Sequence, residues 1–347
     1  MHRICTSLAE NGYIVTLVGT GRKKSAPFVA EKFKQKMIHL LFKRGKLFYA
    51  EYNIRLFFYL LFSRMDVICA IDLDTILPCL FVSRIKKIPR VYDAHELFTE
   101  LPEITTRPAI QRIWKRVERY ALPRFNKAYT VSGSVAAELH RRYGVNYEVI
   151  RNVPLLNKED LHLPEGKFIL YQGAVNEARG FEYLVPAMQY VKDKLVICGD
   201  GNFMQKLVGL VKEYKLEDKI ELKGMLSPAE LIQVNQQAKI GIALIENQGI
   251  NQYLSLANKF FDYIHAALPQ ITMNYPEYRA INERFEVAVL VEDLDPEKIA
   301  AAINNLLLDV VLYRKLQQNC LRARQELNWQ QEEKKLLNFY ESVLTRE

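Results

Sequence analysis

Short runs of apolar residues recur along the first half of the chain, separated by longer stretches whose apolar residues have helical spacing. Such runs predict buried strands of a parallel sheet, and the stretches between them predict helices that cover the sheet. The predicted strands are Ile14–Val18, Val67–Ile71, Arg90–Tyr92, Ala128–Val131 and Glu148–Ile150. This alternation favours an α/β fold of the doubly wound type.

The alternation restarts after Asn152–Pro164, a polar segment with two prolines that is typical of a linker. We therefore expect two Rossmann-like doubly wound domains, residues 1–153 and 154–325, with ligands bound at the carboxyl ends of their strands. The strands predicted in the second half are Phe168–Gln172, Lys194–Cys198, Ile220–Leu222, Ile240–Leu244, Gln270–Met273 and Val287–Val291. The helices predicted between them include Phe181–Val191, Asn202–Tyr214, Ser227–Gln237 and Ala257–Ala266.

A long helical tract, Pro296–Leu344, ends the chain and is interrupted at Glu326–Trp329. No strand is predicted after it. We expect residues 326–347 to form a C-terminal helix that packs back toward the first domain.

Composition and charge narrow this picture. The chain is 49% hydrophobic and 25% charged, as soluble globular proteins are, and its five scattered cysteines favour a reducing, cytoplasmic compartment. Residues 1–90 hold 16 Lys and Arg against 6 Asp and Glu, so the whole net charge of +8 arises there. An anionic surface or an anionic acceptor is therefore expected for the first domain.

The segment Glu31–Arg44 carries part of this basic excess. Its apolar residues Phe33, Met37, Leu40 and Leu41 have helical spacing, with Lys32, Lys34, Lys36 and Lys43 among them. This pattern predicts an amphipathic basic helix, which either rests on anionic membrane lipid or packs on its own domain.

Three polar residues, Asp93, His95 and Glu96, directly follow the predicted strand Arg90–Tyr92. Polar groups just beyond the carboxyl end of a parallel strand face a binding cleft, so we expect these three to be catalytic. His95 could hydrogen-bond a hydroxyl or a leaving oxygen near neutral pH. A loop histidine that bonds a backbone carbonyl would have the same position in the sequence.

Glycines mark two turns between predicted strands and helices in the second half. Gly173 and Gly180 enclose the first turn, where backbone amides, a helix N-terminus and Arg179 could bind a phosphate. Gly199 and Gly201 form the second, which could hold part of a nucleotide. Tight turns without a ligand explain either pattern equally well.

A third group of polar residues opens the predicted helix Ala257–Ala266. Asn258 and Asp262 lie one turn apart on one face, and the Asp262 carboxylate could accept hydrogen bonds from a ribose diol. Lys259, near the helix start, favours a phosphate. A solvated helix face is the alternative.

The order and spacing of these segments resemble the family-4 glycosyltransferases of the GT-B fold, in a bacterial branch, over nearly the whole chain. The segments that carry the likeness are His2–Val18, Asp93–Glu96, Val149–Pro154, Gly173–Gly180, Gly199–Gly201, Lys223–Met225 and Phe261–Pro269. The resemblance implies two Rossmann-like domains facing a cleft, and transfer of a sugar from a nucleoside diphosphate sugar to an acceptor hydroxyl with retention.

The resemblance also implies roles for single residues. Met225 would border the nucleobase, Asp262 would bind the ribose, and His95 would lie against the donor sugar. The diphosphate would be bound by Arg179 and the glycine turn, with no metal and no further cofactor. The expected partners are the nucleotide sugar, a saccharide or lipid-linked acceptor and an anionic membrane surface, but no nucleic acid. Cell-surface glycan or glycolipid synthesis at the cytoplasmic face of the inner membrane is the expected setting.

Three departures from the family leave alternatives open. Ala174 and Ser255 stand where the family carries an arginine and a glutamate. The family's first strand would precede Met1, so we expect the natural protein to have about 20–40 further residues, the length of one strand and its loop. A nucleotide-sugar epimerase and a catalytically inactive GT-B scaffold are therefore the alternative interpretations.

Overall fold

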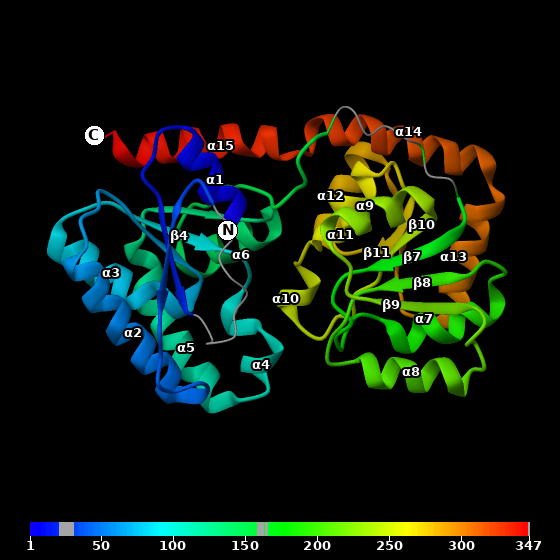
Figure 1. Ribbon diagram of the computed structural model, residues 1–347, viewed down its shortest axis with the longest axis horizontal. Helices are drawn as coiled ribbons and strands as arrows, with labels where there is room; N and C mark the ends of the chain where they lie inside the picture. The colour runs from blue at the N-terminus through cyan, green and yellow to red at the C-terminus, as the bar shows by residue number, and fades with distance from the viewer. Residues whose placement is uncertain (21–30, 158–162, 164–165, 346–347) are drawn as a thin grey trace. The chain divides into compact units, whose positions relative to one another are not determined.

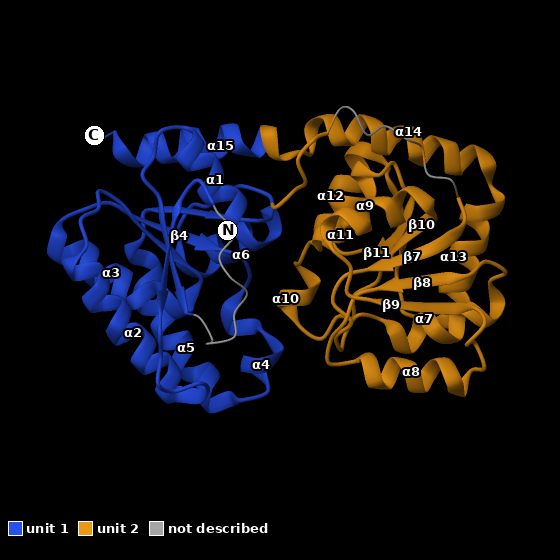
Figure 2. Cartoon of the chain, in the orientation of Figure 1, with its two compact units in different colours: residues 1–151, 331–347 blue, residues 152–330 orange. Residues whose placement is uncertain are grey.

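The computed structural model describes residues 1–20, 31–157, 163 and 166–345. The chain divides into two compact units, as Figures 1 and 2 show. Unit 1 comprises Met1–Arg151 and Gln331–Glu347, and unit 2 comprises Asn152–Gln330.

The described strands of unit 1 form two parallel sheets. One pairs β1 (Thr16–Thr20) with β2 (Lys34–Ile38), and the other has four strands in chain order. These four are β3 (Ile68–Ile71), β4 (Arg90–Ala94), β5 (Lys127–Thr130) and β6 (Glu148–Val149). The helices of the unit are α1 (His2–Glu10), α2 (Gly45–Phe62), α3 (Ile76–Lys86), α4 (Pro102–Thr105), α5 (Pro108–Ala121), α6 (Gly133–Tyr143) and most of α15 (Trp329–Leu344). The five strands predicted for this half are confirmed, and each of their ends lies within two residues of the predicted position.

The helix predicted over Glu31–Arg44 is wrong. Lys34–Ile38 is strand β2, and its register pairs Val18 with Lys36 in a parallel ladder. Exposed lysines alternate with more buried residues from Lys32 to Ile38. That is the two-residue period of a half-buried strand, which the helical spacing of a few apolar residues concealed.

Unit 2 contains one six-stranded parallel sheet with the order β12-β11-β10-β7-β8-β9. Its strands are β7 (Phe168–Gln172), β8 (Leu195–Cys198), β9 (Ile220–Gly224), β10 (Ala238–Ala243), β11 (Gln270–Met273) and β12 (Ala288–Val291). Its helices are α7 (Phe181–Ala187), α8 (Met204–Glu213), α9 (Pro228–Gln237), α10 (Ile250–Tyr253), α11 (Asn258–His265), α12 (Pro276–Phe285), α13 (Pro296–Leu308) and α14 (Val310–Glu326). The six predicted strands and four predicted helices are confirmed.

Helices cover both faces of this sheet. Along β7, Ile169 and Tyr171 belong to the larger buried core, whereas Leu170 between them belongs to a smaller core on the opposite face with Tyr263 of α11. The strand is apolar on both sides, as central strands of parallel sheets are. Strand order reverses between β7 and β10, which makes the carboxyl ends of these two strands the topological switch point where ligands of such sheets bind.

The C-terminal tract is three helices rather than two. The break near Asn328 is confirmed, and a further break lies at Asp309, whose carboxylate accepts a hydrogen bond from the Leu312 amide and caps α14. Within unit 1, α15 lies against β5, with the rings of Phe339 and Tyr129 centred 5.2 Å apart. None of the described helices is long and apolar enough to cross a membrane.

Candidate functional site

An acid–histidine cluster lies at the carboxyl ends of β3 and β4 in unit 1. Asp93, the fourth residue of β4, is 1% exposed, and its Oδ2 accepts a hydrogen bond from the Tyr129 hydroxyl at 2.9 Å. The same oxygen lies 3.2 Å from Nε2 of His95. The His95 backbone amide donates to Asp72 Oδ1 at 2.9 Å. Asp93 therefore orients the His95 ring, and Asp72 holds its backbone.

The carboxylates favour protonation of the histidine. Burial disfavours the His95 cation, but the hydrogen bond to Asp93 and the negative charges of Asp93 and Asp72 outweigh it, so the pKa of His95 is raised. Burial raises the pKa of Asp72 to about 7, despite the opposing charge of His95. Burial also raises the pKa of Glu96, the residue that follows His95 in the sequence. The cluster can therefore hold and exchange a proton near neutral pH.

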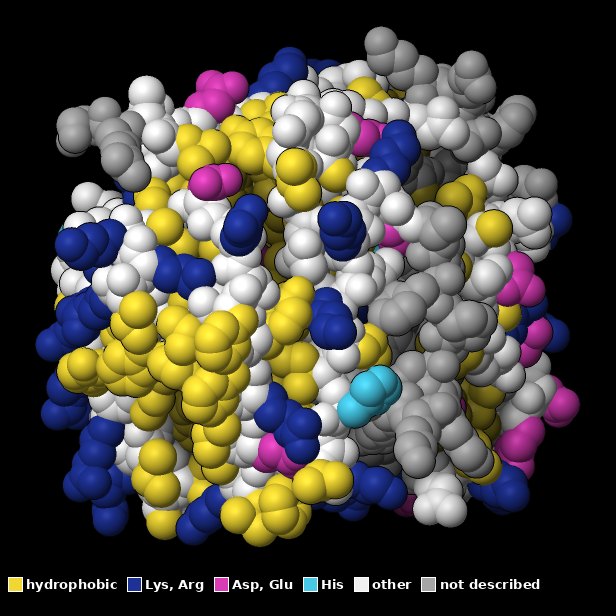
Figure 3. Space-filling view, turned by 60° about the vertical axis from the view of Figure 1, so that its left-hand side comes forward, with side chains coloured by type: hydrophobic (Ala, Val, Ile, Leu, Met, Phe, Trp, Pro, Cys, Tyr) yellow, Lys and Arg dark blue, Asp and Glu magenta, His cyan; other side chains and the backbone are white. Residues whose placement is uncertain are grey.

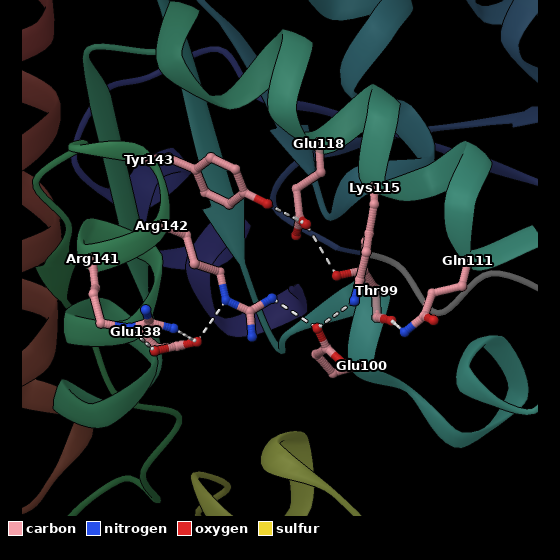
Figure 4. A network of polar contacts seen from close by, with 9 residues as sticks. All are labelled: Thr99, Glu100, Gln111, Lys115, Glu118, Glu138, Arg141, Arg142 and Tyr143. Atoms are coloured by element: carbon pink, nitrogen blue, oxygen red, sulfur yellow. Dashed lines mark hydrogen bonds and ion pairs between the residues drawn. The ribbon is translucent and has the colours of Figure 1, made fainter. Parts of the chain in front are cut away.

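A network of polar contacts anchors the segment that follows His95 (Figure 4). This segment forms the short helix η2 (Phe98–Glu100). The Thr99 hydroxyl donates to the buried Glu118 carboxylate of α5 at 3.0 Å, and Glu100 accepts from Arg142 of α6 at 2.8 Å. Glu118 also accepts from the Tyr143 hydroxyl at 2.6 Å. Two helices therefore hold the loop that carries the histidine.

In unit 2 the two glycine turns lie against each other at the carboxyl ends of β7 and β8. The Gly173 amide donates to the Cys198 carbonyl at 2.9 Å, and the Val175 amide donates to the Asp200 carbonyl at 3.0 Å. Gly199 has φ +150°, and a Cβ there would lie 1.8 Å from the Gly173 carbonyl oxygen. Only glycine allows this approach, so Gly199 and Gly201 support the first turn through their backbone.

Lys259 of α11 lies beneath this turn. A Cβ on Gly173 would lie 3.4 Å from its Cε and 3.6 Å from its Nζ, and the Lys259 side chain is buried. Burial lowers the pKa of Lys259 well below its ordinary value, the charge of Arg179 lowers it further, and Asp262 raises it. Two basic side chains therefore gather at a glycine turn in a setting that penalises the charge of Lys259, and a bound anion would relieve that penalty.

A chain of hydrogen bonds positions Asp262, one turn after Asn258 on α11. The side-chain nitrogen of Gln172, Nε2, donates to Asp262 Oδ2 at 2.9 Å, and Gln172 Oε1 accepts from the side chain of Asn235 of α9 at 2.8 Å. Asn258 Oδ1 accepts from Asn152 at 3.1 Å. The carboxylate of Asp262 is held at the carboxyl end of β7.

The remaining predicted residues lie around this centre. Gly180 has φ +72° and is the N-cap residue of α7. A Cβ on Gly180 would lie 3.0 Å from the Cβ of Leu244, which follows β10. Met225 directly follows β9 and is 74% exposed. It neighbours Gly224, whose carbonyl accepts from the Gly199 amide at 2.8 Å.

The structure thus forms two groups from the predicted residues. Asp93 and His95 contact each other in unit 1, and Gly173, Arg179, Lys259 and Asp262 gather in unit 2. Sequence reasoning missed Asp72, although it directly follows a predicted strand as Asp93 follows the next one. It also missed Tyr171, Gln172 and Asn235, which are buried and carry no local signal of a site.

Comparison with known families agrees with this division. The model of Glycosyltransferase Family 4 matches residues 1–154, and the model of Glycosyl transferases group 1 matches residues 155–323. The chain belongs to the family-4 glycosyltransferases. In this glycosyltransferase the boundary between the two matches falls within three residues of the boundary between the units.

Solved structures resemble this glycosyltransferase along almost its entire length. Sucrose-phosphate synthase from Thermosynechococcus elongatus is 19% identical with a TM-score of 0.80, over 98% of this chain and 92% of that one. Anabaena HepE in complex with UDP and glucose is 13% identical with a TM-score of 0.75, over 98% and 96%. A glycosyltransferase from Rickettsia africae is 15% identical with a TM-score of 0.75, over 99% and 94%. The likeness shows the fold, GT-B with two Rossmann-like domains. No curated protein sequence matches the chain.

Proposed function

We propose that this glycosyltransferase transfers a sugar from a nucleoside diphosphate sugar to an acceptor hydroxyl, with retention at the anomeric carbon and without a metal ion. The observation that carries the proposal is the convergence of Lys259 and Arg179 on the Gly173 turn. In sugar transfer, negative charge develops on the departing diphosphate. The Arg179 cation and backbone amides already in place, together with Lys259 once it is protonated, would stabilise that charge at little cost in reorganisation.

The residues of unit 2 divide the work of donor binding. Backbone amides near Gly173 and the fork of Arg179 would bind the diphosphate oxygens, and Lys259 would add a second charge. Asp262, held by Gln172, would accept hydrogen bonds from the ribose hydroxyls. HepE, which has this fold, was crystallised with UDP and glucose, which supports a nucleotide sugar as the ligand of such a unit.

In unit 1, His95 is the proposed catalytic residue that touches the donor sugar. Asp93 would keep the ring oriented through its Nε2 contact. The raised pKa of His95 makes its protonated form available near neutral pH, where it could donate a hydrogen bond to a sugar or leaving-group oxygen. Glu96 is the further proposed polar contact.

For the acceptor we propose a saccharide or lipid-linked molecule, used in cell-surface glycan or glycolipid synthesis at the cytoplasmic face of the membrane. The basic excess of residues 1–90 supports an anionic acceptor or membrane surface. Among proteins of this fold, WaaB is a lipopolysaccharide outer core galactosyltransferase, 14% identical over 90% of this chain and 85% of its own, with a TM-score of 0.64.

The test is a panel of nucleotide sugars with UDP, GDP, ADP and dTDP as the carrier, scored by thermal shift and by release of free nucleoside diphosphate. We expect nucleotide sugars with one of these carriers to bind. The free nucleoside diphosphate should be released only when an acceptor is present. Lys259→Met and Asp262→Ala should weaken binding at least tenfold, whereas Lys212→Met, an exposed lysine on α8, should not.

Three other outcomes would each contradict one part of the proposed function. Binding without turnover across donors and acceptors would favour an inactive scaffold, and interconversion of the sugar without an acceptor would favour an epimerase. Unchanged affinity in both the Lys259 and the Asp262 variants would overturn the assigned donor site.

A further inference from the structure

Helices α2, α3 and α5 of unit 1 enclose an apolar groove of about 1830 Å³. Its floor contains Trp114 of α5, whose ring meets Tyr49 of α2 at 5.5 Å and Phe98 at 5.0 Å, edge to face. Large apolar side chains at its edge remain exposed, among them Ile54 and Phe58, which are 58% and 51% exposed. Soluble proteins rarely leave a continuous apolar surface of this size without a ligand or partner.

Basic residues border this groove. Lys43, Arg44 and Lys46 stand in the loop before α2 and at its first turn, and Arg107 stands before α5. Within the described part of the chain, none of these four forms an ion pair with a carboxylate. Figure 3 shows hydrophobic side chains gathered on one face with Lys and Arg side chains beside them.

The basic loop is held in place against α2. The backbone amides of Leu41 and Phe42 both donate to the Glu51 carboxylate at 2.9 Å, and Arg55 donates to it at 2.8 Å. These bonds lower the pKa of Glu51, the one to the Phe42 amide most of all. The cations next to Leu41 and Phe42 are thereby kept at the mouth of the groove.

We propose that this groove binds an anionic phospholipid of a bilayer, with the hydrocarbon chain against Trp114 and the phosphate at Lys43, Arg44 and Lys46. The apolar floor of the groove suits a hydrocarbon chain of the lipid, and the positive charges at its border complement the negative charge of the phosphate. A second copy of the chain or a peptide would fit the apolar surface but would not explain the cations. Lipid binding does not depend on glycosyl transfer, so an inactive enzyme would still show it.

The first experiment is co-sedimentation of the full chain with phosphatidylcholine vesicles, with and without phosphatidylglycerol. We expect binding only to the anionic vesicles, and weaker binding at high salt. Lys43→Glu with Lys46→Glu should weaken it about tenfold or more, and Ile54→Ser with Phe58→Ser should weaken it comparably. Because these four side chains are exposed, the variants should fold, which circular dichroism would verify.

Matched control variants lie in unit 2. Lys212→Glu with Arg314→Glu changes the charge by the same amount, and Leu308→Ser with Val311→Ser removes two exposed apolar side chains. Both should bind anionic vesicles as the wild type does. Equal loss in control and groove variants would overturn the proposal.

A second measurement distinguishes insertion from surface adsorption. Brominated lipid chains quench tryptophan fluorescence at contact, and the chain holds two tryptophans, Trp114 and the buried Trp329 of α15. We expect quenching in the wild type that Trp114→Phe removes. Vesicle binding without quenching would overturn occupancy of the groove by a lipid chain. A dimer in light scattering that Ile54→Ser with Phe58→Ser dissociates, with no vesicle binding, would instead assign the groove to a second copy.

Discussion

The ammonium nitrogen of Lys259 lies 3.4 Å from the centroid of the Tyr171 ring. The Tyr171 hydroxyl donates to the Ala174 carbonyl at 2.8 Å, so one buried side chain contacts both the lysine and the glycine turn above it. The ring face offers the cation a favourable electrostatic partner where a carboxylate would compete with a bound phosphate. This arrangement leaves the positive charge available to a ligand.

Replacing Tyr171 should separate the contribution of its ring, which contacts Lys259, from that of its hydroxyl, which bonds Ala174. Tyr171→Phe keeps the ring beneath Lys259 and loses only the hydrogen bond to Ala174, so donor affinity should fall by about threefold or less. Tyr171→Leu loses the ring and should weaken donor binding about tenfold. Calorimetric titration with the nucleotide sugar would measure both. Equal affinities for the two variants would show that the ring makes no contribution.

Donor binding should take up a proton. Burial and the Arg179 charge lower the pKa of Lys259 in the free protein, and a bound diphosphate would raise it again. Between the free and bound pKa values the lysine is neutral before binding and charged after it, so affinity should increase as pH falls through that window. Calorimetry in buffers with different ionisation enthalpies would count the protons.

The control for this prediction is Lys259→Met. It removes the titrating group, so uptake should vanish and the pH dependence should flatten. Uptake that persists in Lys259→Met would assign the proton to another group.

Gly199→Ala should be strongly destabilising. Its Cβ would overlap the Gly173 carbonyl oxygen, and φ +150° is a conformation that alanine avoids, so we expect a loss of about 3 kcal/mol or more. Gly209→Ala is the matched control, because Gly209 lies on α8 with nothing within 4 Å of its Cβ position. That change should stabilise by up to about 1 kcal/mol. Urea unfolding followed by circular dichroism would compare them, and equal stability of the two variants would contradict the close approach.

Asp72→Asn should stabilise unit 1 at alkaline pH. The pKa of Asp72 rises from 3.8 to about 7 on folding, so the folded state favours the neutral form. Its contribution to stability is complete below pH 3.8, is lost as pH rises toward 7, and stays lost above it. Asparagine is neutral, can accept the His95 amide bond and tolerates the positive φ of 52°.

The measurement is thermal unfolding of both proteins between pH 5 and 8, a range that includes the raised pKa. The melting temperature of Asp72→Asn should exceed that of the wild type by more at pH 8 than at pH 5. A difference that is independent of pH would contradict the raised pKa.

Local patterns were enough to predict most elements of the fold. A strand such as Leu195–Cys198 is four consecutive apolar residues before a glycine turn, and a helix such as Pro228–Gln237 follows the capping residue Ser227. Such signals act over a few residues and can be read without knowing what they pack against. The prediction of a helix over Glu31–Arg44 failed because its lysines and apolar residues fit both the helical and the strand period. Only the pairing of β2 with β1 decides between the two.

The sequence by itself determined which turns could bind a ligand. Gly173, Gly199 and Asp93 each follow a predicted strand, and in a parallel sheet the carboxyl ends of strands share one edge. Tertiary structure alone decided what surrounds them. Lys259 reaches the Gly173 turn only because α11 packs against β7, and Asp72 meets His95 only because β3 pairs with β4. Burial and charge contacts between residues distant in sequence set these pKa values, and no local pattern encodes them.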